Sequence, residues 1–544
     1  MRAANLIVKS LEAHGIERVY CVPGESYLAL LDALHDSSIT VIPCRHEGGA
    51  GFMACAEAKL TGKPAVYMAS RGPGATNASI GIHMAQQDAL PVILMLGQVS
   101  REERTRGVFQ EMDYTAVFGS YAKGVYEITE GAKLVELMPR AFHLARKGTP
   151  GPVVFSLPED MLRDEVGDAE AHVYPLPMIG HAAAAITDIQ QLIDKAERPV
   201  MIAGAALRGE RGSAALAKFA EAQRIPVATS WKSQDVFNNG SDLYAGHFNP
   251  GTPKAYRDLL NESDLILAFG TRLGDFASLS YEFPEAPAPR QTLVHVYPDH
   301  EPLGHVFRTD YPLCADPAAV LRDLAHTARV VSSGREAWNR KLNAYVKGMQ
   351  AFTPRSVSDG VDFGVVTEAL SRLAPKNCII TMDAGNMTTW AHRHWVMTPT
   401  NTLIGCVAGA MGLGVPAAVA AAINHPQRTV IAFVGDGGIL MTGQEIATAV
   451  AQGAAPKIVL SDNGIYGTIR THQEREYPQR ISGTQLSNPD FTAWAKSFGI
   501  AAHRLEMGGN VDETVKAFLA EPGPALLHVK SSRISLSAGG TLPA

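Results

Sequence analysis

The sequence has few cysteines and lacks long basic blocks and long apolar runs. Its six cysteines are scattered among 544 residues, with no CxxC pair and no histidine cluster. We therefore expect reduced core residues, neither disulfides nor metal ligands, and a cytoplasmic location. No basic block accompanies the net charge of −6, which excludes nucleic acid and anionic membrane surfaces as expected partners. Small-molecule chemistry is favoured.

Membrane segments and signal peptides are not expected either. The apolar runs fall well short of the ~20 residues that span a bilayer. Lys9 and Glu12 interrupt the N-terminus before a signal-peptide core could form. What the sequence does contain is the composition of a globular protein, with 46% hydrophobic and 19% charged residues. Its length predicts three or four domains.

Strand-like and helix-like segments alternate along the chain, which predicts an α/β fold of doubly wound parallel sheets. Residues 165–181 and 353–364 lack periodicity and suit linkers. The expected blocks are 1–165, 183–330 and 355–544. The turn and strand at Pro150 to Pro158 return at Pro522 to Lys530, a faint repeat indicating that the first and last blocks share a fold.

The stretch from Thr429 to Arg470 carries the clearest chemistry. An apolar run ends in Gly-Asp-Gly-Gly at 435–438, and a second apolar run ends beside Asn463. Parallel strands deliver their carboxyl ends to one sheet edge, so Asp436 and Asn463, 27 residues apart, should converge there. A carboxylate, an amide oxygen and a nearby backbone carbonyl suit Mg²⁺, which keeps substrate phosphates in its shell. Glycines allow close backbone approach, and the N-terminus of the next helix favours phosphate. The unit is interpreted as a Mg²⁺–diphosphate site.

Gly-Asp-Gly by itself is equally the sequence of a tight turn. However, the motif, the spacing to Asn463 and the tail Tyr466 to Arg470 together resemble the binding motif of thiamin diphosphate (ThDP) enzymes. The resemblance implies that the metal ligands are Asp436, Asn463 and the carbonyl of Ile465. It also implies three α/β domains: pyrimidine-binding, central and diphosphate-binding.

Glu47 is the second candidate. Alone, it would be a carboxylate aligned with a helix N-terminus. Within Arg45 to Ala50, however, it resembles the glutamate that hydrogen-bonds the cofactor's aminopyrimidine ring in this family. The resemblance implies cofactor contacts from both outer blocks, at Pro23, Glu47, Pro73, Asn77, Asn386, Met387, Gly409, Met411, Gly435, Asp436, Gly437, Gly438, Asn463, Ile465, Tyr466 and Gly467. Among these, the Gly409 carbonyl accepts from the aminopyrimidine and Met411 holds the cofactor bent.

The segment Phe109 to Asp113 is similar to one of acetolactate synthases, where the glutamine, here Gln110, lies near the reacting centre. For the later proton transfers we weigh His83, His472 and His503, and prefer His472 because it follows the metal-site turn. Each of these histidines is also compatible with an ordinary structural role.

Three departures limit the resemblance. Asp462 stands where the family usually has asparagine, placing a second carboxylate beside the metal site, where we expect it to affect metal affinity or protonation. The residues after Arg470 do not match the Trp-Gln segment of biosynthetic acetolactate synthases. The central block gives no sign of flavin, and the colour of the purified protein would tell whether FAD is bound.

The sequence thus predicts a ThDP- and Mg²⁺-dependent enzyme that takes a 2-oxo acid and ligates its acyl fragment to a second carbonyl, as acetolactate synthases do. Simple 2-oxo acid decarboxylation, or C–C cleavage, is the alternative. A nucleotide-binding oxidoreductase built on turns at Gly204 and Gly435 is the rival from another class. Family resemblance implies a homodimer or homotetramer with the site between subunits.

Overall fold

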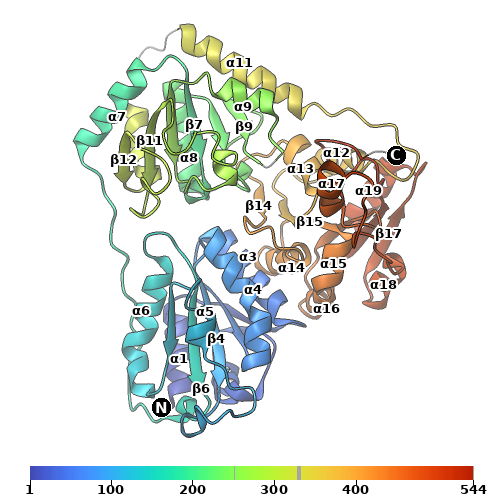
Figure 1. Ribbon diagram of the computed structural model, residues 1–544. Coiled ribbons are helices and arrows are strands. Elements are labelled where there is room, and N and C mark those ends of the chain that lie inside the picture. Colours follow the sequence, from blue (N-terminus) through green and yellow to red (C-terminus); the bar gives the residue numbers. More distant parts are fainter. Residues whose placement is uncertain (250, 328–332, 543–544) are drawn as a thin grey trace.

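The computed structural model describes residues 1–249, 251–327 and 333–542. The chain forms three lobes, and the C-terminal lobe contacts the other two (Figure 1). Each lobe holds one six-stranded sheet, and the three sheets fall within the three blocks expected from the sequence. The expected end of the central block at residue 330 and the last two residues of the chain lie outside the described residues, and the block boundaries stay predictions.

The first sheet is parallel and has the order β2-β1-β3-β4-β6-β5. Its strands are β1 (Arg18–Cys21), β2 (Thr40–Pro43), β3 (Ala65–Ala69), β4 (Val92–Gln98), β5 (Gly124–Glu127) and β6 (Val153–Pro158). Its helices are α1 (Ala3–Ala13), α2 (Leu28–His35), α3 (Glu47–Thr61), α4 (Gly72–Asp88), α5 (Tyr114–Phe118) and α6 (Leu134–Arg146). Strands β3 and β4 are buried throughout, as apolar strands covered on both faces should be.

The last sheet repeats this topology as β14-β13-β15-β16-β18-β17. Its strands are β13 (Ile379–Met382), β14 (Thr402–Ile404), β15 (Val430–Gly435), β16 (Lys457–Asp462), β17 (Ala501–Leu505) and β18 (Ala525–Lys530). Its helices are α12 (Phe363–Leu373), α13 (Thr388–His394), α14 (Gly414–Asn424), α15 (Asp436–Thr442), α16 (Ile446–Ala451), α17 (Gly467–Glu476), α18 (Phe491–Ser497) and α19 (Val511–Ala520). Strands β6 and β18 hold equivalent places, so the predicted repeat is confirmed.

The central sheet has a different order, β12-β11-β10-β7-β8-β9, which is the doubly wound order of many dinucleotide-binding folds. Its strands are β7 (Pro199–Ala203), β8 (Val227–Thr229), β9 (Tyr244–His247), β10 (Leu265–Phe269), β11 (Thr292–Tyr297) and β12 (Tyr311–Cys314). Its helices are α7 (Ala183–Lys195), α8 (Glu210–Gln223), α9 (Lys254–Leu260), α10 (Pro317–His326) and α11 (Ser333–Gln350).

Packing explains Gly204 without a nucleotide. A Cβ atom at Gly204 would lie 2.4 Å from the carbonyl oxygen of Gly270, so two strand-to-helix turns meet there too closely for any side chain. Because a fold alone does not fix function, the sheet order adds no support for the oxidoreductase alternative. An ordinary structural turn is the interpretation that the geometry favours.

The small residues that follow Glu47 have a packing role. Helix α3 lies against α4 within its own lobe and against α14 of the C-terminal lobe (Figure 1). At the first contact the Cβ of an alanine at Gly51 would lie 2.9 Å from the Cα of Gly81, so the two helix backbones nearly touch. The glycines and alanines of α3 and α14 let two lobes join through one compact helical layer.

Three local expectations are corrected by the structure. The segment from Gly72 to Asn77, which contains the predicted cofactor contacts Pro73 and Asn77 and which the family resemblance suggests to be a loop, is the first turn and a half of α4. The single helix expected after Asp436 is divided into α15, a 3₁₀ turn at Gly443–Glu445 and α16. Cys314 is exposed at the end of edge strand β12 and is not a core residue, whereas the other five cysteines are buried and none forms a disulfide.

Among the described residues, no helix combines the length and the apolar character needed to cross a membrane.

A buried ion pair fixes the N-terminal lobe to the C-terminal lobe. Lys59 of α3 and Asp88 of α4 lie 2.8 Å apart, with side chains 5% and 2% exposed. The second oxygen of Asp88 accepts from the backbone N–H of Val407 at 2.9 Å, and Lys59 donates to the carbonyl of Gly405. The pair therefore holds the loop that leads to Gly409.

We predict that Asp88→Ala destabilises this junction by about 3–5 kcal/mol, because it leaves the Lys59 ammonium buried without its counter-charge. Three lobes need not unfold in one step. The measurement is therefore the first thermal transition in calorimetry. Glu136→Ala, which removes an exposed ion pair with Arg140, is the control and should change stability by less than about 1 kcal/mol. Equal transitions for both variants would contradict the assignment.

Candidate functional site

One cavity opens at the carboxyl edge of the C-terminal sheet, with a volume of about 880 Å³ including its mouth. Ala384 to Met387 follow β13, and Gly435 to Gly438 begin at the last residue of β15. The strand order reverses between these two strands. Ligands of doubly wound folds bind at this point. The cavity is lined by all the C-terminal cofactor-binding residues predicted from the sequence, namely Asn386, Met387, Gly409, Met411, Gly435, Asp436, Gly437, Gly438, Asn463, Ile465, Tyr466 and Gly467.

Asp436 is the acidic group of this cavity and is only 4% exposed. Burial raises the pKa of its carboxyl to about 6. Its Oδ1 accepts from the N–H of Gly437 at 3.0 Å, and its Oδ2 accepts from the N–H of Gly464 at 2.7 Å and the side-chain amide of Asn488 at 2.8 Å. Donors from three chain segments thus hold one buried carboxylate beside the cavity.

The oxygen ligands predicted for Mg²⁺ lie in the same wall. Asn463 and Ile465 both line the cavity, and Arg533 holds their turn by donating to the carbonyl of Asn463 at 2.9 Å. In the described part of the chain, no three His, Cys, Asp or Glu side chains are grouped to bind a metal by themselves. A cation at Asp436 therefore needs amide and carbonyl oxygens and a ligand's own oxygens, which is the donor set that Mg²⁺ accepts.

Glycine shapes the wall between Asp436 and the aromatic side. A Cβ atom at Gly437 would lie 2.5 Å from the Tyr466 ring and 3.3 Å from the Met411 thioether. The absence of a side chain at Gly437 lets these three residues pack closely along the cavity wall. Helix α15 has only seven residues, so the glycine backbone and a cation, more than a helix dipole, would provide for an anion here.

Glu47 belongs to a second group, in the N-terminal lobe. It begins α3, and its Oε2 accepts from the Asn77 amide of α4 at 3.0 Å. Pro73 lies one turn earlier on α4, and Pro23 follows β1, so these residues also gather at the carboxyl edge of their sheet. None of this group lines the cavity described above. Within one chain, the predicted site therefore exists as two separate halves.

Gln110 is held in an unusual backbone conformation. Its φ of 63° is in the left-handed region, which a side chain other than glycine rarely adopts. Its carbonyl accepts from the N–H of Gly72 at 3.0 Å, at the start of α4. Glu111 fixes the loop by pairing with Arg104 at 2.8 Å, and neighbouring Phe109 is 72% exposed. Strain of this kind concentrates at functional sites.

The three candidate histidines lie in different places. His472 is exposed on α17 and contacts Arg475, outside the cavity that Thr468 and Ile469 of the same helix line. His503, on edge strand β17, pairs with Glu521. The ring of His83 packs against Tyr121. The structure brings none of them to the cavity, and the role predicted for His472 stays a prediction.

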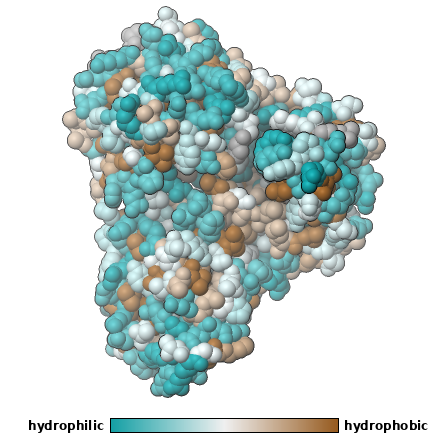
Figure 2. All heavy atoms as spheres, viewed as in Figure 1, coloured by the Kyte–Doolittle hydropathy of each residue, from teal (hydrophilic) through white to brown (hydrophobic). Residues whose placement is uncertain are grey.

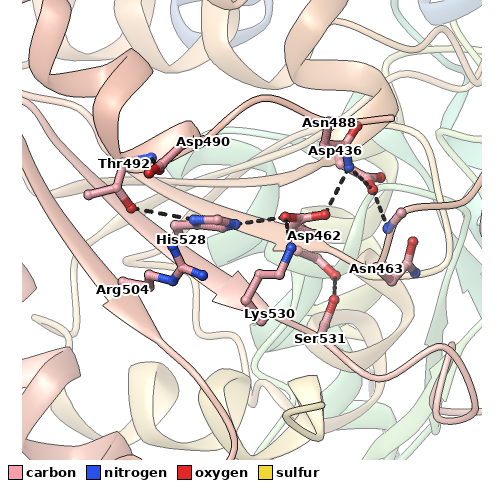
Figure 3. Close-up of polar contacts among 12 residues, drawn as sticks. Asp436, Asp462, Asn463, Asn488, Asp490, Thr492, Arg504, His528, Lys530 and Ser531 are labelled. Atoms are coloured by element: carbon pink, nitrogen blue, oxygen red, sulfur yellow. Dashed lines mark hydrogen bonds and ion pairs between the residues drawn. The ribbon is translucent and has the colours of Figure 1, made fainter. Parts of the chain in front are cut away.

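Asp462 does not enter the cavity, contrary to the expectation of a second carboxylate beside the metal. It is buried, and its Oδ2 binds His528 at 2.8 Å and Lys530 at 2.7 Å, on neighbouring strand β18 (Figure 3). Burial alone would raise its pKa, but hydrogen bonds from His528, Lys530 and Asn488 hold the pKa of Asp462 well below its usual range. The side-chain amide of Asn488 donates to both Asp462 and Asp436.

Sequence reasoning missed two parts of the site. The C-terminal segment contributes Ser531, Ser532, Ser535 and Leu536 to the cavity wall. Arg355 of the second linker anchors it, donating to the carbonyls of Ser537 and Ala538 at 2.7 and 3.0 Å. A serine-rich stretch without periodicity carries no signal of this role.

Glu445 is the second omission. This buried side chain of the C-terminal lobe accepts 3.0 Å hydrogen bonds from the N–H groups of Arg45 and His46, immediately before Glu47. Burial raises the pKa of Glu445. The sequence shows only that Glu445 follows Asp436 by nine residues, which does not predict a contact with the segment before α3. The segment from Asp436 to Glu445 therefore joins the wall of the cavity to the residues that immediately precede Glu47.

In a comparison with known protein families, each of the three lobes matches a domain of the same enzyme family. Residues 1–117 match the N-terminal TPP (thiamine pyrophosphate) binding domain of thiamine pyrophosphate enzymes, residues 186–324 match their central domain, and residues 383–529 match their C-terminal TPP binding domain. Thiamine pyrophosphate and ThDP are the same compound. The second and third matches begin near the start of α7 and at the end of β13.

Three proteins that are similar to this chain over nearly its full length are named acetolactate synthases. A probable acetolactate synthase large subunit of Methanocaldococcus jannaschii is 32% identical over 97% of this chain and 92% of its own length. Acetolactate synthase isozyme 2 large subunit of Escherichia coli is 30% identical over 97% and 95%. The catabolic acetolactate synthase of Raoultella terrigena is 29% identical over 97% and 94%.

We predict that Gly437→Ala weakens binding of thiamine pyrophosphate about tenfold or more, because the new methyl group pushes Tyr466 and Met411 into the cavity. Calorimetric titration in the presence of Mg²⁺ measures this. Gly274→Ala, in the central lobe with nothing within 4 Å of its Cβ, is the control. Unchanged affinity in the Gly437 variant would show that the ligand lies elsewhere.

Proposed function

Because the chain belongs to the thiamine pyrophosphate enzyme family, we propose that it is a carboligase of the acetolactate synthase type. In this reaction a 2-oxo acid such as pyruvate loses CO₂, and its acyl fragment bonds to the carbonyl carbon of a second molecule with uptake of one proton. The single observation that carries the proposal is the convergence of all twelve predicted C-terminal cofactor-binding residues on one cavity. Near-full-length similarity to acetolactate synthases supports the subtype.

The residues present fit thiamine pyrophosphate with Mg²⁺. Asp436, Asn463 and the carbonyl of Ile465 would hold the cation and, through it, the diphosphate. Gly437 offers the backbone approach, and the N-terminus of the ten-residue helix α17 adds free N–H groups at the cavity wall. Met411 would support the cofactor between its two ends, as the family resemblance implies. When bound, the cofactor supplies a nucleophilic carbon and an electron sink.

The role proposed for Glu47 is to hold a proton at the aminopyrimidine ring nitrogen and so activate the cofactor. Asn77 fixes one oxygen of Glu47, which leaves the other for this bond. Since Glu47 lies outside the cavity of its own chain, a second copy would have to supply it. Exposed apolar residues Leu440, Met441 and Val450 on α15 and α16 favour such an assembly. Figure 2 shows apolar surface in the hollow between the lobes. We propose at least a homodimer.

Leu536, Ile469 and Met411 would give the substrate pocket its apolar character, excluding water from the reacting centre. Gln110 would reach it from the second chain, from the strained loop at the start of α4. We propose that this side chain favours ligation over release of the acyl fragment. Simple decarboxylation shares the other residues and is the alternative outcome.

FAD is an open part of the proposal, tested by the visible absorption of the purified protein. With its buried cysteines reduced, we expect the enzyme in the cytoplasm.

We predict that Glu47→Gln lowers acetolactate formation from pyruvate by about 10²- to 10⁴-fold, because an amide cannot take part in the proton transfer. Product is measured with thiamine pyrophosphate and Mg²⁺ present, and again after both are removed by chelation and dialysis. The exposed Glu136→Gln serves as the control and should match the native enzyme. Undiminished activity in Glu47→Gln, or in the cofactor-free native protein, would rule out the mechanism.

The two roles of Gln110 separate in a glycine variant. Glycine adopts φ near 63° without strain, so Gln110→Gly should keep its thermal stability within about 1 kcal/mol while losing the amide. We predict a lower ratio of acetolactate to acetaldehyde from pyruvate. Gln110→Asn, which keeps an amide and tolerates this φ, should be intermediate. An unchanged ratio in both variants would remove Gln110 from the reacting centre.

A further inference from the structure

We propose that Asn488 is a positioning residue for the metal ligand Asp436, and that Asp462, tethered to β18, acts through Asn488. This inference rests on the proposed Mg²⁺ site and concerns how the chain prepares it. Asn488 precedes α18 and does not line the cavity, so it makes no contact with the ligand itself. Its importance follows from the two carboxylates that it separates (Figure 3).

The amide of Asn488 bridges both acids. Its Nδ2 donates to Asp436 Oδ2 at 2.8 Å and to Asp462 Oδ1 at 2.8 Å, so each of its two N–H bonds serves one carboxylate. This arrangement also fixes the orientation of the amide, because the opposite orientation would set Oδ1 against two negative charges. Within the described residues, Asn488 Oδ1 is buried and has no hydrogen-bond partner. A buried acceptor left unsatisfied indicates that the two donor bonds dominate.

These bonds select the oxygen available to a cation. Asp436 Oδ2 already accepts two donors, from Asn488 and from the N–H of Gly464, whereas among the described residues Oδ1 accepts only the N–H of Gly437. Oδ1 therefore retains acceptor capacity on the residue that lines the cavity. Without Asn488, the carboxylate could rotate and present either oxygen. Outer partners of this kind orient metal ligands elsewhere, and their loss lowers metal affinity.

Asp462 is fixed from the opposite side. It pairs with Lys530 across neighbouring strands β16 and β18, and His528 lies two residues before Lys530, so both face Asp462. Their bonds of 2.7 and 2.8 Å occupy Oδ2 and compensate its charge away from the cavity. Only Oδ1 remains to hold Asn488. The acid that departs from the family pattern thus supports the metal site from behind without adding a ligand.

The test is a titration of Mn²⁺, followed by electron paramagnetic resonance, on the purified full chain with saturating thiamine pyrophosphate. We expect Asn488→Ala to raise the dissociation constant for Mn²⁺ about 10- to 100-fold. Thr492→Val is the matched control, because Thr492 contacts the other ring nitrogen of His528 at 3.4 Å and no group of the metal site. Its Mn²⁺ affinity should equal that of the native protein.

A double-mutant cycle tests whether Asp462 acts through Asn488. Asp462→Ala alone should weaken Mn²⁺ binding, but should change it little further in the Asn488→Ala background. Additive losses would overturn the coupling, and native affinity in Asn488→Ala would overturn the positioning role. Thermal unfolding without metal and cofactor checks that each variant is folded. A folded variant should show the same unliganded transition as the native protein. If the native protein itself binds no Mn²⁺ with thiamine pyrophosphate, the proposed function fails instead.

Discussion

A parallel sheet delivers the carboxyl ends of all its strands to one edge, and the chemistry of this chain depends on that constraint. At the C-terminal edge, residues after β13, β15, β16 and β18 meet around one cavity although 148 positions separate Ala384 from Ser532. The buried Asp436 is acceptable there only because N–H donors arrive from three different segments. No single helix or loop could supply them.

Much of this was predictable from local signals. Glycines beside Asp436 and the apolar runs before them indicate strand ends, and the spacing to Asn463 fits one crossover, so the diphosphate half of the site could be inferred. The α/β class followed from the alternation of segments. Division of the helix after Asp436 into α15, a 3₁₀ turn and α16 could not be inferred, because tertiary contacts, including those of Glu445, override local propensity.

The residues that sequence reasoning missed share a physical cause. Leu536 reaches the cavity only because Arg355 anchors the C-terminal segment, and Asn488 matters only because it lies between Asp436 and Asp462. Neither relation leaves a periodicity or a motif. The place expected for Asp462, beside the metal, was wrong for the same reason: its environment is set by His528 and Lys530 on a strand 66 to 68 positions later.

The repeated strand order of the outer sheets also has a consequence for how such a chain could arise and change. Under the proposed function, two edges with the same strand order divide a single ligand between them. One has acquired the acid, amide and glycines around Asp436, and the other has acquired Glu47 and Asn77. Because each edge would recognise only one end of that ligand, a substitution at one edge would leave the contacts of the other edge unchanged. The strands of the central sheet contribute no residue to the cavity, and this sheet alone has a different strand order.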